Sequence, residues 1–185
     1  CRTRRATDLG VYGTQGVAAA GNVPGGRTTS ISWIDSADNL WLFGGFGHDS
    51  GGISGELNDL WKWNGSQWTW ISGSSTANAL GVYGTQGVAA AGNVPGARIG
   101  SISWRDNADS LWLFGGYSFS VGSCTLCYRN DLWKWDGSQW TWVSGSNTIN
   151  ASGVYGTRGV AAAGNVPGAR YGGSISWRDS VGNLW

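Results

Sequence analysis

Met, Lys and Glu, three residues that favour helices, are absent or scarce in this sequence. It contains no Met, few Lys and Glu, and only 12% charged residues in a chain of 185. Its 33 glycines mark many turns, while its tryptophans and β-branched residues favour strands. The composition therefore disfavours helices and predicts an all-β protein, with short strands separated by turns of Gly, Asn, Asp and Ser.

Clusters of positive charge and long apolar runs are also missing. The formal net charge is +1 and the arginines are scattered, so no basic stripe is present and nucleic acid is not an expected partner. No run approaches the roughly 20 apolar residues that span a bilayer, so no membrane span is predicted. The start, CRTRRATDLG, lacks the apolar segment of a signal peptide, and any targeting sequence is expected upstream.

What the sequence does contain is a repeat. The string GVYGTQGVAAAGNVPG begins at Gly10, again at Gly81 and, with one Gln to Arg change, at Gly153. The period is 71 and then 72 residues. Self-similarity at a fixed period indicates a fold built from copies of one unit.

Each period predicts four short strands, here lettered A to D. Strand A is SISW, strand B is LWLFGG, strand C is DLWKW, and strand D is QWTWIS or QWTWVS. Asp-rich turns join A to B, and turns containing Asn64-Gly65 or Asp136-Gly137 join C to D as hairpins. The B–C and D–A connections are long, and the D–A connection has 25 residues at 73–97 and again at 145–169.

The spacing of tryptophans predicts how the units pack. Trp61 and Trp63 of strand C, and Trp68 and Trp70 of strand D, alternate with other residues, so all four are expected on one face of the hairpin. Strand B is apolar on both sides, which is typical of a strand covered on both faces. Units that are apolar on both faces are expected to stack on copies of themselves.

The repeat resembles a known family through the strings VPGAR, SISW, LWLFGG and NDLWKWDGSQW, which are similar to the kelch repeat of β-propeller proteins. The resemblance implies that the diglycine ends strand B and that each period is one blade. The chain is thus expected to be a fragment of one kelch-type β-propeller, an incomplete ring of about two and a half four-stranded antiparallel blades of 71–73 residues. The blade strands are expected at 28–72, 99–144 and 171–185, and the D–A connections at 1–27, 73–98 and 145–170.

The long connections predict where a ligand binds. In an antiparallel meander the B–C and D–A connections lie on one rim, called here the loop rim, and long loops on a rigid scaffold commonly carry function. The D–A string presents Tyr12, Tyr83 and Tyr155, one in each period. Two interpretations stay open: the tyrosines anchor the string on a blade, or the string is a binding element presented once per blade.

Arginine also recurs at the loop rim. Arg27, Arg98 and Arg170 follow VPG at the entrance to strand A, where they would either hold an acidic ligand or pin neighbouring blades. Arg129, beside strand C, and His48, the single histidine, complete the candidate ligand-binding residues. A lone loop histidine is more often a surface residue than a catalyst. No catalytic residue, metal-ligand set or cofactor is predicted.

Two cysteines, Cys124 and Cys127, form CTLC in the second B–C loop. The four ligands of a structural zinc site are not available there, so a loop-stapling disulfide in an oxidising compartment is expected. In the A–B turns, acidic residues such as Asp35 and Asp106 are expected to accept hydrogen bonds from their own backbone.

These expectations combine into one function and one alternative. The function predicted is a non-catalytic bacterial propeller, secreted or on the cell surface, that binds a protein or glycan partner through the loop rim. The alternative is part of a galactose oxidase-like or other carbohydrate-active enzyme. Resemblance to galactose oxidase would imply a copper site with His and Tyr ligands, and such catalytic residues would lie outside these 185 residues.

Overall fold

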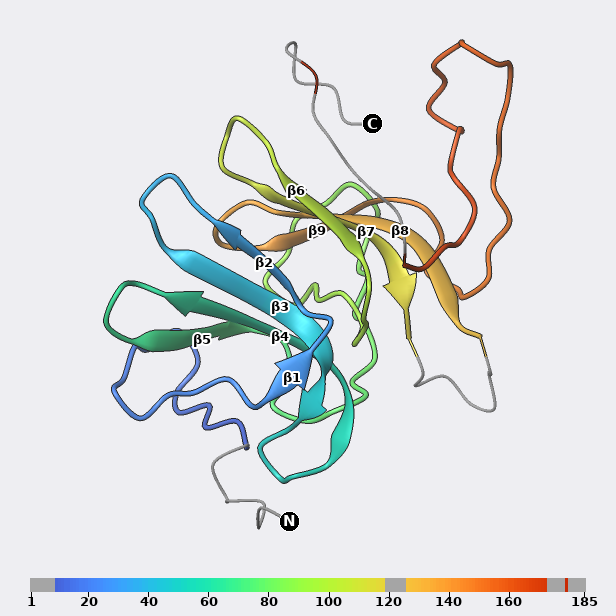
Figure 1. The fold of residues 1–185 in the computed structure, drawn as a ribbon. Coiled ribbons are helices and arrows are strands. Elements are labelled where there is room, and N and C mark those ends of the chain that lie inside the picture. Colours follow the sequence, from blue (N-terminus) through green and yellow to red (C-terminus); the bar gives the residue numbers. More distant parts are fainter. Residues whose placement is uncertain (1–8, 119–125, 173–178, 180–185) are drawn as a thin grey trace.

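A computed structural model of the protein describes residues 9–118, 126–172 and 179, which form two antiparallel sheets and confirm the all-β prediction (Figure 1). The first sheet contains β1 (Arg27–Thr28), β2 (Ile31–Ile34), β3 (Leu40–His48), β4 (Ser54–Trp63) and β5 (Trp68–Ser72). The second contains β6 (Ile102–Arg105), β7 (Leu111–Tyr117), β8 (Tyr128–Trp135) and β9 (Trp140–Ser144). Within the described ranges, no helix is long and apolar enough to cross a membrane.

Both sheets are meanders in which strands adjacent in the sequence pair with each other. The second sheet has the order β6-β7-β8-β9. The first has the equivalent order, with β2 and the short β1 both paired with β3. Each sheet therefore corresponds to one period of the repeat and to the four strands predicted from it.

The diglycine does not end strand B, and that prediction is wrong. β3 continues through Gly44 and Gly45 to His48, and β7 likewise continues to Tyr117. The register between β3 and β4 shifts from Phe43 to Gly45, which marks a β-bulge, and the two glycines have φ values of 61° and 100°. The glycines are needed for the bulge, and the ladder resumes beyond it.

The four hairpin tryptophans share one face, as predicted. β4 pairs with β5 so that Trp61 lies opposite Trp70 and Trp63 lies opposite Trp68, with residues 64–67 forming the turn. Residues directly opposite in an antiparallel pair point to the same side. β8 and β9 repeat this register with their own four tryptophans.

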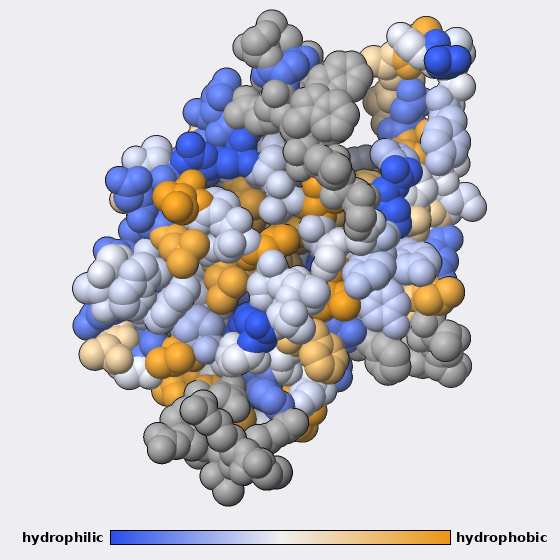
Figure 2. Space-filling view, viewed as in Figure 1, coloured by the Kyte–Doolittle hydropathy of each residue, from blue (hydrophilic) through white to orange (hydrophobic). Residues whose placement is uncertain are grey.

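The two sheets pack front to back. Trp41, Phe43 and Leu60 of the first sheet share one buried cluster with Leu111, Leu113, Trp133, Trp135 and Trp140 of the second. In the second sheet, Leu111 and Leu113 lie opposite Trp135 and Trp133, so the cluster contains the tryptophan face of this sheet. In the first sheet, Trp41 lies opposite Lys62, the neighbour of Trp61, so the cluster contains the face opposite to the hairpin tryptophans. The second tryptophan hairpin therefore packs against the neighbouring unit, as predicted. On the face drawn in Figure 2, hydrophobic and hydrophilic surface are intermixed.

The repeated GVYG…NVPG strings form the same small loop three times. The first lies along β5, where the backbone N of Gly16 donates to Trp70 O, and the second lies along β9, where Gly87 N donates to Trp142 O, both at 2.8 Å. These two loops cover the outer edge strands of the sheets. An isolated bridge closes each loop: Val11 with Val23, Val82 with Val94, and Val154 with Val166.

Candidate functional site

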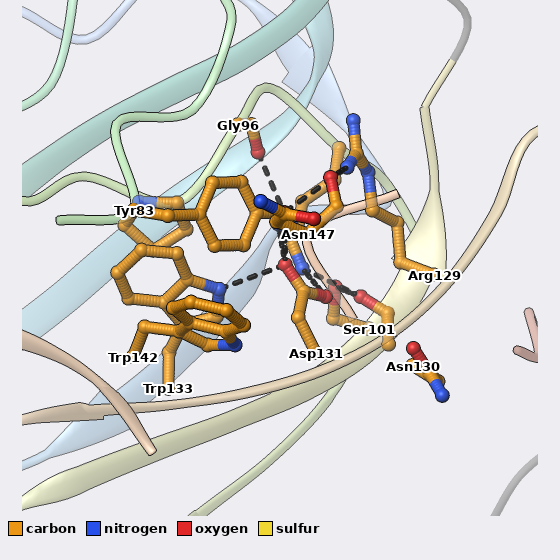
Figure 3. Close-up of polar contacts among 12 residues, drawn as sticks. Tyr83, Gly96, Ser101, Arg129, Asn130, Asp131, Trp133, Trp142 and Asn147 are labelled. Atoms are coloured by element: carbon orange, nitrogen blue, oxygen red, sulfur yellow. Dashed lines mark hydrogen bonds and ion pairs between the residues drawn. The ribbon is translucent and has the colours of Figure 1, made fainter. Parts of the chain in front are cut away.

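A buried carboxylate lies where the second sheet approaches the loop rim. Asp131 of β8 accepts hydrogen bonds from Nη1 and Nη2 of Arg98 at 2.8 and 2.7 Å. Tyr83 OH and Trp133 Nε1 donate to the same carboxylate at 2.7 and 2.8 Å (Figure 3). Asp131 is 0% exposed and Arg98 is 1% exposed, so these donors replace water around the charge.

The first sheet contains the same arrangement. Asp59 of β4 accepts hydrogen bonds from both terminal nitrogens of Arg27, from Tyr12 OH at 2.6 Å and from Trp61 Nε1 at 2.7 Å. The same four residue types thus occupy equivalent positions in both periods. Because their polar atoms bind one another inside the protein, this Tyr–Arg–Asp–Trp cluster holds the repeat together.

The electrostatics of the cluster follow from burial and pairing. Burial alone would raise the pKa of Asp131, but the charge of Arg98 and the hydrogen bonds from Arg98, Tyr83 and Trp133 hold that pKa below its ordinary value. Burial, together with the negative charge of Asp131, raises the pKa of Tyr83 to about 12. At neutral pH the cluster therefore contains an ionised Asp–Arg pair and a neutral tyrosine.

Alkaline titration is expected to reveal Tyr83. A tyrosine whose native pKa is raised contributes stability that is present below the unfolded value of about 10 and lost as the pH rises through the native value. The free energy of unfolding should therefore fall between pH 10 and about 12, the pKa of native Tyr83. Urea unfolding at several alkaline pH values, for the wild type and Tyr83→Phe, measures this. The same pH dependence in both proteins would contradict it.

Arg98 also joins the two sheets. Its backbone N donates to Leu57 O and its backbone O accepts from Gly45 N, both at 3.1 Å, so its backbone belongs to the bulge of the first sheet. Its side chain reaches Asp131 in the second sheet. This geometry corresponds to the pinning of neighbouring units, one of the two roles expected of the arginines.

The asparagine of the NDLW string holds the long connections. Asn58 Oδ1 accepts from Ser74 N at 2.9 Å, and its Nδ2 donates to Pro95 O at 3.1 Å. Asn130 makes the two equivalent bonds to the next connection. Sequence reasoning missed the roles of this asparagine and of the aspartate after it. The available signal was that the asparagine and the aspartate both precede LWKW unchanged in the two complete periods.

Three tyrosines gather on the loop rim of the second sheet and are called here the tyrosine cluster. The rings of Tyr128 and Tyr171 are stacked with 6.2 Å between centroids, and Tyr117 lies 5.5 Å from Tyr171. The Tyr171 ring can lie against the backbone of residue 100 because that residue is glycine; a Cβ there would collide with the ring. A pocket of about 420 Å³ adjoins Tyr128, and Tyr171 is 43% exposed. Aromatic surface is therefore available here to a partner.

Arg129 lies on the opposite side of β8 from Tyr128, because adjacent residues of a strand point to opposite faces. Its Nη1 donates to Tyr83 OH at 3.0 Å and to Asn147 O at 3.5 Å (Figure 3). It lines a second pocket of about 330 Å³. Arg129 is thus a candidate arginine that is both buried and placed at a pocket.

The other predicted site residues lie apart from these pockets. His48 ends β3, and its Nδ1 is hydrogen-bonded to Ser54 Oγ at 3.0 Å. Arg170 is exposed, and its Nε donates to Gly168 O at 3.0 Å. Tyr155 is 71% exposed, in contrast to the equivalent tyrosines in the first two loops, whose hydroxyls bind Asp.

The cysteine and A–B turn predictions have separate outcomes. Cys127 is disulfide-bonded, while Cys124 lies outside the described residues. Asp35 Oδ1 accepts hydrogen bonds from Ala37 N and Asn39 N at 3.0 and 2.9 Å, and Asp106 repeats the pattern, so the turn prediction is confirmed. In the part of the chain that the structure describes, no group of three or more His, Cys, Asp or Glu is arranged to hold a metal ion.

Comparisons with known proteins add little to this geometry. Neither a protein-family model nor a curated protein matches the sequence. Among solved structures, the chain is similar to YjhT at 14% sequence identity, with 86% of this chain and 80% of the YjhT chain covered and a TM-score of 0.26. A TM-score of this size carries no argument about fold or function.

Proposed function

We propose that the chain is part of a non-catalytic, kelch-type β-propeller whose loop rim binds a protein or glycan partner. The front-to-back packing of the two sheets supports the propeller. At this contact the second sheet uses its tryptophan face and the first sheet its opposite face, so the same contact could be repeated by further copies on the two remaining faces. A contact of this head-to-tail kind generates a ring when the rotation between copies closes.

The tyrosine cluster is the observation that carries the binding proposal. Tyrosine provides a large, rigid apolar surface with a polar hydroxyl, and it is enriched where proteins contact partners. The rings of Tyr128 and Tyr171 are held in place by stacking, so little conformational entropy is lost when a partner contacts them. The position in the first period that is equivalent to Tyr128 is Glu56, and the one equivalent to Tyr171 is Thr28, so the first period lacks these two rings.

The proposed location is outside the cell or on its surface. The disulfide of Cys127 supports it, because disulfides form and persist mainly in oxidising compartments. The scarcity of charged residues, at 12% of the chain, gives the loop rim few groups for an electrostatic partner such as nucleic acid. A protein or glycan surface suits the half-buried Tyr128 and the exposed Tyr171 better.

Removing one ring of the tyrosine cluster tests the proposal. The full chain is screened on a glycan array and against candidate extracellular proteins, and the affinity for any partner found is measured by calorimetry. Tyr171→Ala is expected to weaken binding about tenfold or more, the effect of losing a central aromatic contact. Tyr171→Phe should retain most of the affinity, because it keeps the ring.

Two variants serve as matched controls. Tyr155→Ala removes an exposed tyrosine outside the cluster, and Ala108→Ser changes an exposed A–B turn. Both are expected to bind like the wild type. If Tyr171→Ala binds the partner with unchanged affinity, the tyrosine cluster is not the binding surface and the proposal fails.

A further inference from the structure

One buried cation distinguishes the second period from the first. Arg129 pairs with Gly116 across β8 and β7, and the equivalent residue opposite Gly45 in the first sheet is Leu57. Leu57 is 0% exposed and Arg129 is 4% exposed, so an arginine takes the place of a buried apolar side chain. Such an exchange introduces a charge into a site that the fold itself fills with leucine.

The described part of the chain provides no carboxylate for this charge. Asp131, the nearby acid, already binds Arg98 through both of its oxygens and accepts from Tyr83 as well. Arg129 reaches only neutral acceptors, the Tyr83 hydroxyl and the Asn147 carbonyl. The buried group formed by Arg98, Asp131 and Arg129 therefore carries one net positive charge, whereas Arg27 and Asp59 balance each other in the first sheet.

The donors of Arg129 are also incompletely used. Its Nε is buried and has no hydrogen-bond partner among the described residues. Both bonds that the guanidinium makes start from Nη1. A guanidinium has five N–H donors in a rigid fork, so the Nε and Nη2 donors are left for another acceptor. Buried donors without a partner are costly and rare, and a bound ligand, ion or water is one explanation for such a donor.

The pocket beside Arg129 has the size and lining of a small-molecule site. Its volume is about 330 Å³, and its walls include the apolar side chains of Leu80 and Ile149. In Figure 3, Asn147 lies beside the Arg129 guanidinium, and the Tyr83 ring lies on the other side of Asn147. A mostly apolar pocket with one fixed charged group is the usual form of a site for a small organic ligand.

We propose that this pocket binds a small molecule that carries one carboxylate group on an apolar body. The carboxylate balances the charge of Arg129 and accepts from its unused donors, and the apolar body packs between Leu80 and Ile149. One guanidinium matches one carboxylate in charge and in shape. This site goes beyond the proposed function, because it lies on the opposite side of β8 from the tyrosine cluster.

Calorimetry with benzoate tests the site on the full chain in chloride-free buffer. Benzoate is expected to bind the wild type, while benzamide, which has the same shape without the charge, should bind at least about tenfold more weakly, because a charge-assisted hydrogen bond is lost. Inorganic phosphate, which lacks an apolar body, should also bind more weakly than benzoate. Equal binding of benzoate and benzamide, or tighter binding of phosphate than of benzoate, would overturn the proposal.

Two variants place the binding at Arg129. Arg129→Leu introduces the residue of the first period, should fold because Leu57 fits there, and should lose benzoate binding. Ile149→Trp keeps the charge but fills the pocket, and it should lose binding as well. Benzoate affinity unchanged in both variants would overturn the proposal. Tyr171→Ala should bind benzoate like the wild type, so failure of this site and failure of the tyrosine cluster are told apart.

Discussion

Arg98→Ala is expected to lower the free energy of unfolding by about 3–5 kcal/mol, the effect of breaking a buried ion pair by removing one partner. Without Arg98, Asp131 has no cation beside its two oxygens, because Arg98 is hydrogen-bonded to both of them, and any charge at this almost fully buried position is uncompensated. The variant also loses the link from the bulge of the first sheet to β8 of the second. Urea unfolding followed by tryptophan fluorescence measures the loss.

Acidification separates this cause from a general packing defect. In the wild type the pKa of Asp131 is lowered, so its contribution to stability is present above the unfolded value of about 3.9 and is lost as the pH falls through the native value. Without Arg98, burial dominates and favours the neutral acid. The variant should therefore lose less stability on acidification, and the difference between the two proteins should narrow toward pH 3. A constant difference from pH 7 to pH 3 would argue against an uncompensated charge.

Arg105→Ala is the matched control for this prediction. Arg105 also forms an ion pair, with Asp109 at 2.7 Å, and it also reaches the other sheet by donating to Ile34 O at 3.0 Å. Its pair is 39% and 34% exposed, so water screens the charges and replaces the lost contacts. A much smaller loss of stability is expected than for Arg98→Ala.

Features set by local spacing could be predicted from the sequence. The common face of Trp61, Trp63, Trp68 and Trp70 follows from the two-residue period of a strand and from the hairpin turn. The hydrogen bonds of Asp35 to its own turn are equally local, since they span two to four residues. The bulge at the diglycine was missed, because a ladder that resumes after two glycines looks in sequence like a strand that ends there.

The partners of the buried charges could not be predicted. Asp59 binds Arg27 and Tyr12, which lie 32 and 47 residues away, and no local pattern selects these partners. The recurrence of arginine after VPG in each period favoured a structural role but left a ligand-binding role open. The surroundings of Arg129 could not be predicted from the sequence either. Its sequence position is next to a strand, and only the fold reveals that it is buried, has no acid beside it among the described residues, and lines a pocket.

Gly145→Ala is expected to destabilise the protein strongly, because two costs coincide at this residue. Gly145 has a φ of 82°, and a side chain in this left-handed region costs about 1–2 kcal/mol. A Cβ at this position would also collide with the backbone carbonyl of Asn130 in β8, and such overpacking adds about 1–3 kcal/mol. The equivalent Gly73 has the same φ sign and meets the carbonyl of Asn58, so the constraint belongs to the repeat.

Gly137→Ala separates the two costs. Gly137 has a φ of 99°, but a Cβ there would meet nothing within 4 Å, so this variant should show the backbone cost alone. Thermal unfolding of both variants measures the difference, and equal losses would mean that the collision at Asn130 is relieved by a small shift.

Because Gly145 places Ser146 N at 3.0 Å from Asn130 Oδ1, any such shift moves the start of the following connection. Asn147, which accepts from Arg129, lies in that segment, so Gly145→Ala should also weaken benzoate binding while Gly137→Ala leaves it unchanged.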